Sequence, residues 1–329
     1  MKSKTSQFVI AVAAVLAMSL VSTDSAKAVA DQHHDQAPGY YRLYVGDLEV
    51  TALYDGTGSF DPSWLIGKKS VIDATVAVLK KQPHFLDDAD DVFLVNTGKR
   101  LILLDTGTGG WWGGPAFGRV EASLRQAGYT HEQVDLVLLT HMHSDHIGGL
   151  TTNDGKAKRI YPNAEVYVAK AESDFWLSPE NAAKAPKEAQ GFFTSAQAIS
   201  APYIKAGKWH TFSDTDEIAE GVKIVPLHGH TPGHTGYEFS SKGQKILFWG
   251  DIIHAAIVQL QHPEVHVGFD IDPVAAVAQR KRLLSTLAGE NTLVAGPHMP
   301  YPGIGYLLKE GNAYGWASVV YTDQLAPKQ

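Results

Sequence analysis

The chain of 329 residues contains no cysteine. Neither a disulfide framework nor a lipidated cysteine is therefore available. The fold must be stabilised by its hydrophobic core, and a content of 44% hydrophobic residues is enough to build a large one. Any metal ion bound by this chain must be held by histidine and carboxylate side chains.

The chain also lacks an excess of positive charge. It has 28 lysine and arginine residues against 35 aspartate and glutamate residues, which gives a net charge of −7. Nucleic-acid binding depends on neutralising phosphates with a basic surface. We therefore expect no nucleic-acid partner.

Long hydrophobic runs are absent after the N-terminal region. Lys2 and Lys4 precede an apolar stretch at residues 8–21, and small residues follow it. This arrangement is typical of a cleaved secretory signal, and the apolar stretch is short of the ~20 residues of a membrane anchor. We expect residues 1–30 to be a signal peptide, residues 31–329 to form one domain, and the mature protein to be periplasmic or secreted with no membrane attachment.

Alternating and continuous apolar segments predict a mixture of strands and helices. Two hairpins are expected, the first turning at Gly46-Asp47 and the second at Gly98-Lys99. Residues 174–208 carry several aromatic side chains and are expected to be an irregular or helical insertion rather than a linker. Strands are expected at 40–45, 48–53, 92–97, 101–104, 136–139, 223–227, 245–249 and 292–295, and helices at 117–127 and 273–288.

The densest group of metal-binding residue types directly follows the expected strand at 136–139. His141, His143, Asp145 and His146 form a His-x-His-x-Asp-His pattern followed by Gly-Gly. In an extended loop His141 and His143 project to one side, while Asp145 and His146 reach a neighbouring point. One segment can therefore supply ligands to two adjacent metal ions, which makes this pattern a strong signal.

Three further residues extend the candidate site. His234, Asp251 and His298 each lie at or just after the end of an expected strand. Loops collected at one edge of a sheet are the usual place for a site on a rigid scaffold. A single histidine beside glycine and proline is often only a turn residue, so these three positions gain weight from the first cluster.

At this point the chain resembles the metallo-β-lactamase superfamily. The resemblance covers residues 40–310 and rests on Asp105-Thr106-Gly107, on the His141 to His146 cluster, and on His234, Asp251 and His298 in that order. It implies an α/β fold, a four-layer αββα sandwich. It also implies that Asp105 lies behind the ligands and orients a ligand imidazole.

The family pattern divides the ligands between two metal ions. His141, His143 and His234 would hold one ion, Asp145, His146 and His298 the other, and Asp251 would bridge them. Two ions roughly 3.5–4 Å apart lower the pKa of a shared water from 15.7 towards about 7 and so provide a bridging hydroxide as nucleophile. Asp251 and Asp145 are the carboxylates expected to take part in catalysis.

The ligand types indicate the metal and the reaction class. Five imidazoles and two carboxylates suit zinc, and they also admit manganese, cobalt or iron. We expect two divalent ions, most simply Zn²⁺. The absence of cysteine excludes the β-lactamases that use a thiolate ligand. Because His143 is not a carboxylate, the pattern departs from that of the diiron oxidoreductases of the family, and hydrolysis is favoured.

Within the superfamily the chain is most similar to the methyl parathion hydrolase group. These exported organophosphorus hydrolases also cleave aryl esters and lactones, and the resemblance extends to residues 38–53, 127–129 and 250–254. The alternative is an acyl-homoserine lactone lactonase. In the lactonases a tyrosine that contacts substrate follows the bridging aspartate by three residues, but here that position is His254. We interpret His254 as a hydrogen-bonding residue behind the ligands rather than a general acid.

Aromatic residues near the motifs indicate an apolar substrate pocket. Trp112, Trp176, Phe192 and Phe193 are expected to line it, with ordinary core packing as the alternative for each ring. Without an arginine or lysine cluster to clamp an anion, the substrate should be a neutral ester or lactone. The family suggests a homodimer. The rival from another class is a periplasmic protein that binds metal without catalysis.

Overall fold

The computed structural model describes residues 32–33, 36–79 and 87–323. Internal contacts group Ala37–Gln329 as one unit, separate from Met1–Gln36. The predicted signal peptide, residues 1–30, lies outside the described residues. Among the helices that are described, none combines the length and the apolar character needed to cross a bilayer.

Two large sheets carry the Ala37–Gln329 unit. The first has seven strands in the order β1-β2-β4-β5-β6-β7-β8, and the second has six in the order β15-β14-β13-β11-β10-β9. The strands of the first sheet are β1 (Tyr40–Val45), β2 (Leu48–Ser59), β4 (Asp87–Asn96), β5 (Leu101–Leu104), β6 (Leu136–Leu138), β7 (Glu165–Ala169) and β8 (Trp209–Phe212). Those of the second are β9 (Val222–Pro226), β10 (Thr235–Ser241), β11 (Gln244–Phe248), β13 (Leu293–Ala295), β14 (Ile304–Glu310) and β15 (Ala313–Ser318). A short pair, β3 (Leu65–Ile66) with β12 (His266–Val267), stands apart from both.

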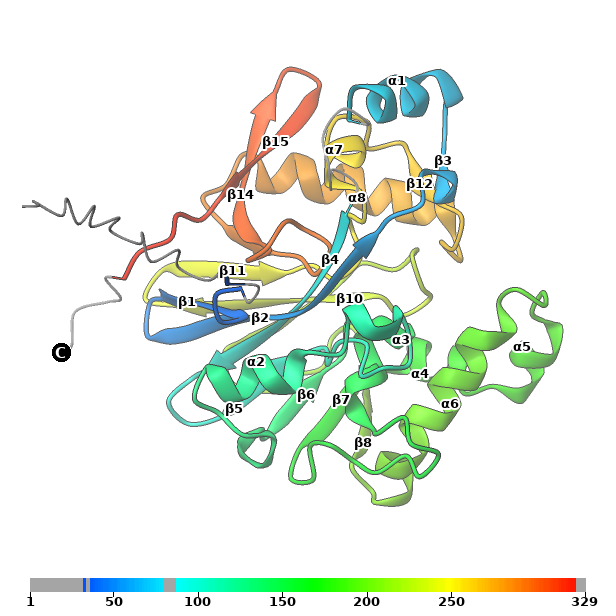
Figure 1. Cartoon of the computed structure of the whole chain (residues 1–329), viewed down its shortest axis with the longest axis vertical. Helices are drawn as coiled ribbons and strands as arrows, with labels where there is room; N and C mark the ends of the chain where they lie inside the picture. The colour runs from blue at the N-terminus through cyan, green and yellow to red at the C-terminus, as the bar shows by residue number, and fades with distance from the viewer. Residues whose placement is uncertain (1–31, 34–35, 80–86, 324–329) are drawn as a thin grey trace, which may run out of the picture. The chain divides into compact units, whose positions relative to one another are not determined.

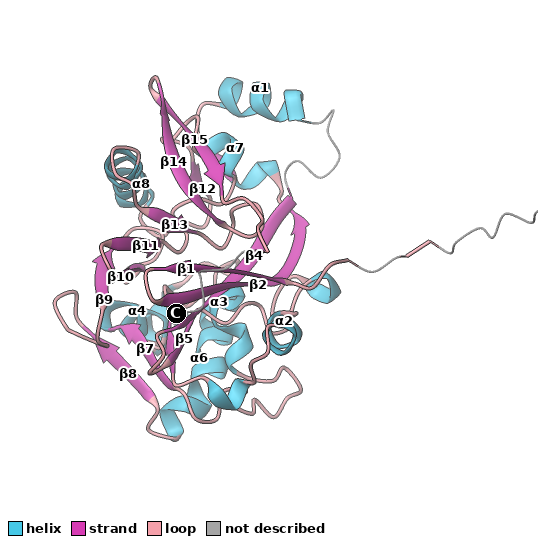
Figure 2. Cartoon of the chain, turned by 90° about the vertical axis from the view of Figure 1, so that its left-hand side faces the viewer, coloured by secondary structure: helices cyan, strands magenta, loops and turns pink. Residues whose placement is uncertain are grey.

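Helices cover the outer face of each sheet, so the layers run helix, sheet, sheet, helix (Figure 1). On the side of the first sheet lie α2 (Val120–Gln126), α3 (Ser144–Ile147), α4 (Lys170–Trp176), α5 (Pro179–Lys184) and α6 (Gln190–Lys205). On the side of the second lie α1 (Lys69–Leu79), α7 (Ala256–Gln259) and α8 (Pro273–Leu287). Figure 2 shows the same layers from the side. The expected four-layer αββα sandwich is the observed architecture.

The core is divided in the same way as the layers. One cluster fills the space between the two sheets, where Phe93 of β4 meets Phe248 of β11 with ring centroids 5.4 Å apart. A second packs the first sheet against α2 and α6, and a third packs the second sheet against α8. Strands such as β5 and β6 are therefore buried on both faces, which explains their continuous apolar sequences.

Most of the expected elements agree with the structure. Both hairpins form, with Val45 paired to Leu48 across the first turn and Asn96 paired to Leu101 across the second. The insertion at residues 174–208 is helical, because it contains the end of α4 and all of α5 and α6. Sequence periodicity did not indicate β7, β8, β10, β14, β15 or α1, which are short or mix polar and apolar residues without a clear period.

The topology determines where the site can form. β5, β6 and β7 are parallel neighbours in the first sheet, and β11 and β13 are parallel neighbours in the second. The carboxyl ends of parallel strands meet at the same edge, where ligands are commonly bound.

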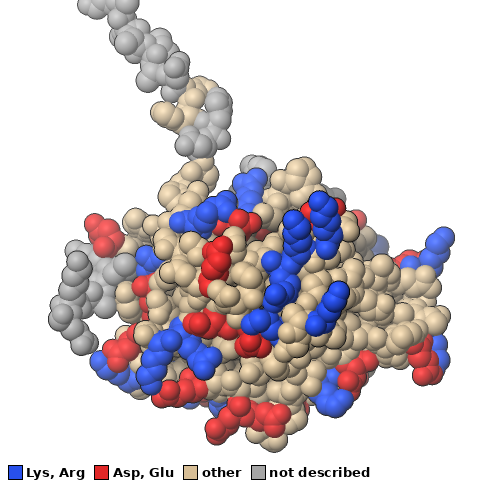
Figure 3. Space-filling model, turned by 90° about the horizontal axis from the view of Figure 1, so that it is seen from below, with Lys and Arg blue, Asp and Glu red and all other residues tan. Residues whose placement is uncertain are grey.

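The face in Figure 3, seen from below, carries basic and acidic side chains among uncharged ones.

Candidate metal centre

Asp105 builds the first ligand loop. It follows β5 in the left-handed region, with φ of +61°, a conformation that aspartate tolerates better than most residues. Its Oδ1 accepts the backbone N–H of Thr140 at 2.7 Å, and its Oδ2 accepts the Thr140 hydroxyl at 2.7 Å. Oδ2 also lies 2.9 Å from Nδ1 of His146. One carboxylate therefore holds the start of the loop and orients the imidazole near its end.

Four side chains converge on a first position. Nδ1 of His143 lies 3.1 Å from Nε2 of His141 and 3.1 Å from Nε2 of His230. Oδ2 of Asp251 lies 3.4 Å from the His141 nitrogen and 3.2 Å from the His230 nitrogen. Two ligands about 2.0–2.1 Å from one tetrahedral ion are separated by about 3.3 Å. The spacing of these four atoms fits a single divalent ion.

A second position lies on the other side of Asp251. Oδ1 of Asp251 is 3.2 Å from Nε2 of His146 and 3.3 Å from Nε2 of His298. Asp145 faces the same point, with Oδ2 3.7 Å from the His146 nitrogen and 3.9 Å from the His298 nitrogen. Asp251 therefore offers one oxygen to each position, which is the arrangement of a bridging carboxylate.

Buried polar atoms at the second position support a metal site. Nε2 of His146, Nε2 of His298 and Oδ1 of Asp251 are all buried, and none has a hydrogen-bond partner among the described residues. Leaving such atoms unpaired costs about 1–3 kcal/mol each. A divalent ion bound by imidazole and carboxylate groups satisfies all three atoms at once, so these residues fit such an ion.

Oxygen atoms on the outer side fix the orientation of the ligand imidazoles. Nδ1 of His230 lies 2.7 Å from Oδ1 of Asp270, and Nδ1 of His298 lies 3.1 Å from the carbonyl oxygen of Ala89, with the Asp88 carboxylate 3.0 Å away. Thr140 Oγ1 lies 3.0 Å from Nδ1 of His141. Such partners select the tautomer and make the facing nitrogen more basic. Asp88 and Asp270 were not found from the sequence, because neither belongs to a motif.

The assignment of His234 as a metal ligand is corrected by the geometry. Nε2 of His234 accepts the backbone N–H of Asp251 at 2.9 Å, and Nδ1 lies 3.0 Å from the carbonyl oxygen of Leu227. Both ring nitrogens are therefore engaged by backbone groups. His230 occupies the place expected for His234 and completes the first position.

The local fold explains this exchange. His234 directly precedes β10, where the pairing of Leu227 N–H with the carbonyl oxygen of His234 continues the β9–β10 ladder. His230 lies nearer the middle of the connection between the two strands and can reach the centre. The sequence offered both histidines in one short segment, and spacing alone did not distinguish them.

The pKa values at the first position differ among its histidines. Burial and neighbouring imidazoles hold the pKa values of His141 and His143 well below the ordinary value, so these rings are neutral and able to bind a cation. Burial opposes the charge on His230, but hydrogen bonds to Asp251 and Asp270 raise its pKa to about 9. Without metal, a proton on His230 is therefore favoured.

Asp251 is kept ionised by its neighbours. Burial by itself would raise its pKa, but the surrounding imidazoles, first His146 and then His298 and His141, hold that pKa well below the ordinary value. Its carboxylate is thus available as an anion to both positions. A fully buried anionic group needs such compensation, because an isolated buried charge is strongly unfavourable.

His254 lies directly beside the bridging carboxylate. Its Nε2 is 3.0 Å from Oδ2 of Asp251, and its ring stacks on that of His298 with centroids 5.1 Å apart. Its backbone N–H donates to Oε1 of the buried Gln259 at 2.7 Å. The ring is therefore held against the site from several sides, and its position allows the hydrogen-bonding role expected from the sequence.

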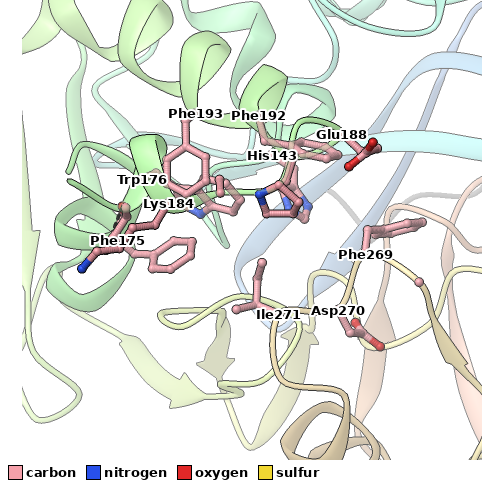
Figure 4. Close-up of a pocket in the computed structure, with 15 residues that line it drawn as sticks. His143, Phe175, Trp176, Lys184, Glu188, Phe192, Phe193, Phe269, Asp270 and Ile271 are labelled. Carbon is pink, nitrogen blue, oxygen red and sulfur yellow. Dashed lines mark hydrogen bonds between the residues drawn. The ribbon is translucent and has the colours of Figure 1, made fainter. Parts of the chain in front are cut away.

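A cavity of about 490 Å³ opens beside the first position. Trp176, Phe192 and Phe193 line it from α4 and α6, and Phe269 and Ile271 face them from the loop before α8 (Figure 4). The ring of His143 lies between the two sides, 4.9 Å from that of Phe192 and 5.3 Å from that of Trp176. Three of the four expected aromatic residues therefore lie beside the candidate metal ligands.

One of the expected pocket residues lies elsewhere. Trp112 packs against Phe117 with ring centroids 5.2 Å apart and is not among the lining residues of the cavity. Phe269 and Ile271, which sequence reasoning did not identify, form the opposite wall. An isolated aromatic residue before an expected helix carries no signal that a sequence pattern could detect.

Comparisons with known proteins agree with this geometry. Residues 87–298 match the profile of the metallo-beta-lactamase superfamily. A protein of Mycobacterium tuberculosis described as a probable metallo-hydrolase is 28% identical over 182 residues, which cover 50% of this chain and 56% of that protein. The chain thus spans about half the length of the curated relatives that it matches.

Solved structures extend the similarity over most of the chain. The sequence of the hydrolase AbOPH, whose crystal structure is described as belonging to the beta lactamase superfamily, is 38% identical to this chain. The two structures superpose over 88% of this chain and 100% of the AbOPH chain, with a TM-score of 0.81. The dizinc quorum-quenching lactonase AidC, in complex with a homoserine product, is 26% identical with a TM-score of 0.78, over 87% of this chain and 99% of its own. The profile match spans both candidate metal positions, and the chain belongs to the metallo-β-lactamase superfamily.

Proposed function

We propose that this protein is a dinuclear metal hydrolase that cleaves neutral esters, namely organophosphate triesters, aryl esters and lactones. The observation that carries the proposal is the position of His143, which faces the first metal position through Nδ1 and the apolar cavity through its ring. A substrate seated against the aromatic wall would bring its polar centre to the metal ligands.

The lining of the cavity favours an uncharged substrate. Its aromatic and aliphatic residues offer apolar surface, which suits an aryl or acyl group. Lys184 and Glu188 also line it, but Lys184 pairs with Glu180 at 2.5 Å on an exposed helical turn. Recognition of a phosphate anion would call for a cation aimed inward, ideally arginine in a bidentate contact. The side chains present therefore favour a neutral ester.

The ligand sets divide the chemistry between metal and protein. Two divalent ions, zinc by preference, would polarise the C=O or P=O bond and lower the pKa of water at the site. Asp251 would keep the two positions adjacent, and Asp145 would contribute to the second position from the less buried side of the site. The rings of Trp176 and Phe192 would exclude bulk water around the ester and orient it.

A leaving-group series tests the reaction. His254 is not assigned as a proton donor to the leaving oxygen, because its Nε2 is already engaged by Asp251. We expect activated nitrophenyl esters and paraoxon to react faster than unactivated alkyl esters, because good leaving groups need no protonation. Equal rates across leaving groups of widely different pKa would contradict this expectation.

Lactone hydrolysis is the second candidate. It is supported by the 26% identity to the lactonase AidC across nearly its full length. Comparing an N-acyl homoserine lactone with methyl parathion and 4-nitrophenyl acetate under one set of conditions ranks the candidates by kcat/KM. A kcat/KM for the lactone far above the other two would assign the protein to the lactonases.

Metal dependence separates catalysis from simple metal storage. Turnover of 4-nitrophenyl acetate should be lost after treatment with a chelator and return with zinc. A protein that binds two zinc ions but turns over no ester, lactone or phosphotriester would be a metal-binding protein without catalysis. We also propose a periplasmic or secreted location and a homodimer, which mass analysis of the exported protein and light scattering would test.

A further inference from the structure

Glu172 is a carboxylate with no exposure to solvent, located in the first turn of α4. Its Oε1 accepts the backbone N–H of Met142 at 2.9 Å and the indole N–H of Trp176 at 2.6 Å. Its Oε2 accepts the backbone N–H of Gly233 at 2.8 Å. Three N–H groups from three segments therefore converge on one side chain.

Two of these segments carry all three imidazoles of the first metal position. Met142 stands between His141 and His143, and Gly233 lies three residues after His230. The ligand loops come from different sheets, since the first follows β6 and the other connects β9 to β10. Glu172 hydrogen-bonds to both loops.

Close packing at Gly233 keeps its loop against Glu172. A Cβ atom on Gly233 would lie 2.4 Å from the backbone nitrogen of Glu172, which is too close for any larger residue. The third donor, Trp176, forms part of the cavity wall beside His143. Among the contacts of the described residues, Glu172 accepts no hydrogen bond from the ligands of the second position, Asp145, His146 and His298.

We propose that Glu172 is the positioning residue of the first metal position. It holds the His141–His143 loop and the His230 loop at the separation that one ion requires, and it joins both loops to the pocket wall through Trp176. This inference rests on the metal site of the proposed function. It predicts an asymmetry: loss of the carboxylate should weaken the first position more than the second, because all three imidazoles of the first position lie on the two anchored loops, whereas His298 of the second does not.

Glu172→Gln is the sharpest perturbation because it keeps the size of the side chain. A carboxylate accepts through both oxygens, whereas an amide has one oxygen and one NH₂ group. If the amide oxygen faces Met142 and Trp176, the NH₂ group meets the N–H of Gly233. If it faces Gly233, the NH₂ group meets the other two donors. Either orientation leaves one ligand loop without its hydrogen bond to residue 172.

The experiment is a Zn²⁺ and Co²⁺ titration of the metal-free full chain, with a competing chelator and with Co²⁺ absorption as the readout. His298→Ala, which removes a ligand of the second position, identifies the binding step that belongs to each position. For Glu172→Gln we expect first-position affinity to fall about 10–100-fold, the range seen when partners of metal ligands are removed. Saturating zinc should then restore most of kcat.

Glu165→Gln is the matched control. Glu165 lies on β7, pairs with Lys208 and His210 at the surface, and contacts neither ligand loop. It should bind both ions as the unmodified protein does. If Glu172→Gln does not fold, Gly233→Ala pushes the His230 loop away from Glu172, because its Cβ would lie 2.4 Å from the Glu172 backbone nitrogen, and it should weaken the same position.

Three outcomes distinguish the possible failures. A folded Glu172→Gln variant with both affinities and kcat unchanged would overturn the inference. Equal weakening of both positions, or a loss of stability alone, would assign Glu172 to general support of the fold and would also overturn it. If the unmodified chain binds no metal, the proposed function itself fails, whatever the variant does.

Discussion

His230, and not His234, faces the first metal position, so substitutions of these two histidines should have different effects. His230→Ala removes one of the three imidazoles of the first metal position. Removing a residue that is hydrogen-bonded to a metal ligand lowers metal affinity about 10–100-fold. His230→Ala should lower it by more, because a direct ligand is lost. The protein should then retain one ion, at the second position.

His234→Ala should act on stability instead. Its ring accepts the N–H of Asp251 and contacts the carbonyl oxygen of Leu227, and both backbone groups are buried with it. Each buried group left without a partner costs about 1–3 kcal/mol. We therefore expect the free energy of unfolding of the metal-free protein to fall by about 2–4 kcal/mol, the sum for two partly compensated groups.

Urea unfolding of the metal-free proteins and metal analysis after dialysis provide the two measurements. His228→Ala is the control in the same loop, because His228 is partly exposed and faces Asp214 at 3.3 Å rather than the metal ligands. It should change neither quantity. The reasoning would be refuted if His234→Ala lost one ion with unchanged metal-free stability while His230→Ala still bound two.

Three further predictions concern other parts of the site. In Asp105→Asn, the side chain no longer has two anionic oxygens to accept the Thr140 N–H and to orient His146. Metal affinity at the second position should therefore fall about 10–100-fold in a metal titration. An unchanged affinity would contradict the role of Asp105. Burial raises the pKa of Asp91 well above its ordinary value, and neither of its oxygens has a hydrogen-bond partner among the described residues. The folded state thus favours the protonated acid, and stability is lost as pH rises above the unfolded pKa of about 3.9. Asp91→Asn should remove this part of the pH dependence and raise the free energy of unfolding near pH 7 by about 1–3 kcal/mol, measured by urea unfolding. The argument would be wrong if the variant's gain in stability were no larger at pH 7 than at pH 4. Phe192→Ala should raise KM for aryl esters several-fold with a smaller change in kcat, because the ring borders the cavity beside His143, and steady-state kinetics with an equal KM would place the aryl group elsewhere.

Local sequence patterns determined the elements that are strongly periodic or tightly turned. The turn at Gly98-Lys99 predicted β5 as the second strand of a hairpin, and a continuous apolar run predicted β6, which is buried on both faces in the sandwich. The helix predicted at 273–288 begins at Pro273 and ends one residue earlier than expected, at Leu287, since proline begins it and glycine follows its cap. The His141 to His146 segment was recognised because its ligands are close in sequence, and the loop that carries them follows directly from a strand.

The roles of residues that contact distant parts of the chain were determined only by the tertiary structure. The exchange of His234 for His230, the Asp270 and Asp88 partners, the Glu172 contacts and the Phe269 wall all depend on how loops from two sheets meet. Sequence spacing specifies which way a side chain points along its own strand or helix, but not which distant backbone group its polar atoms will find. The dense ligand motif and the fold class could therefore be read from the chain itself, whereas the ring nitrogen that faces each metal position was set only by packing the two sheets together.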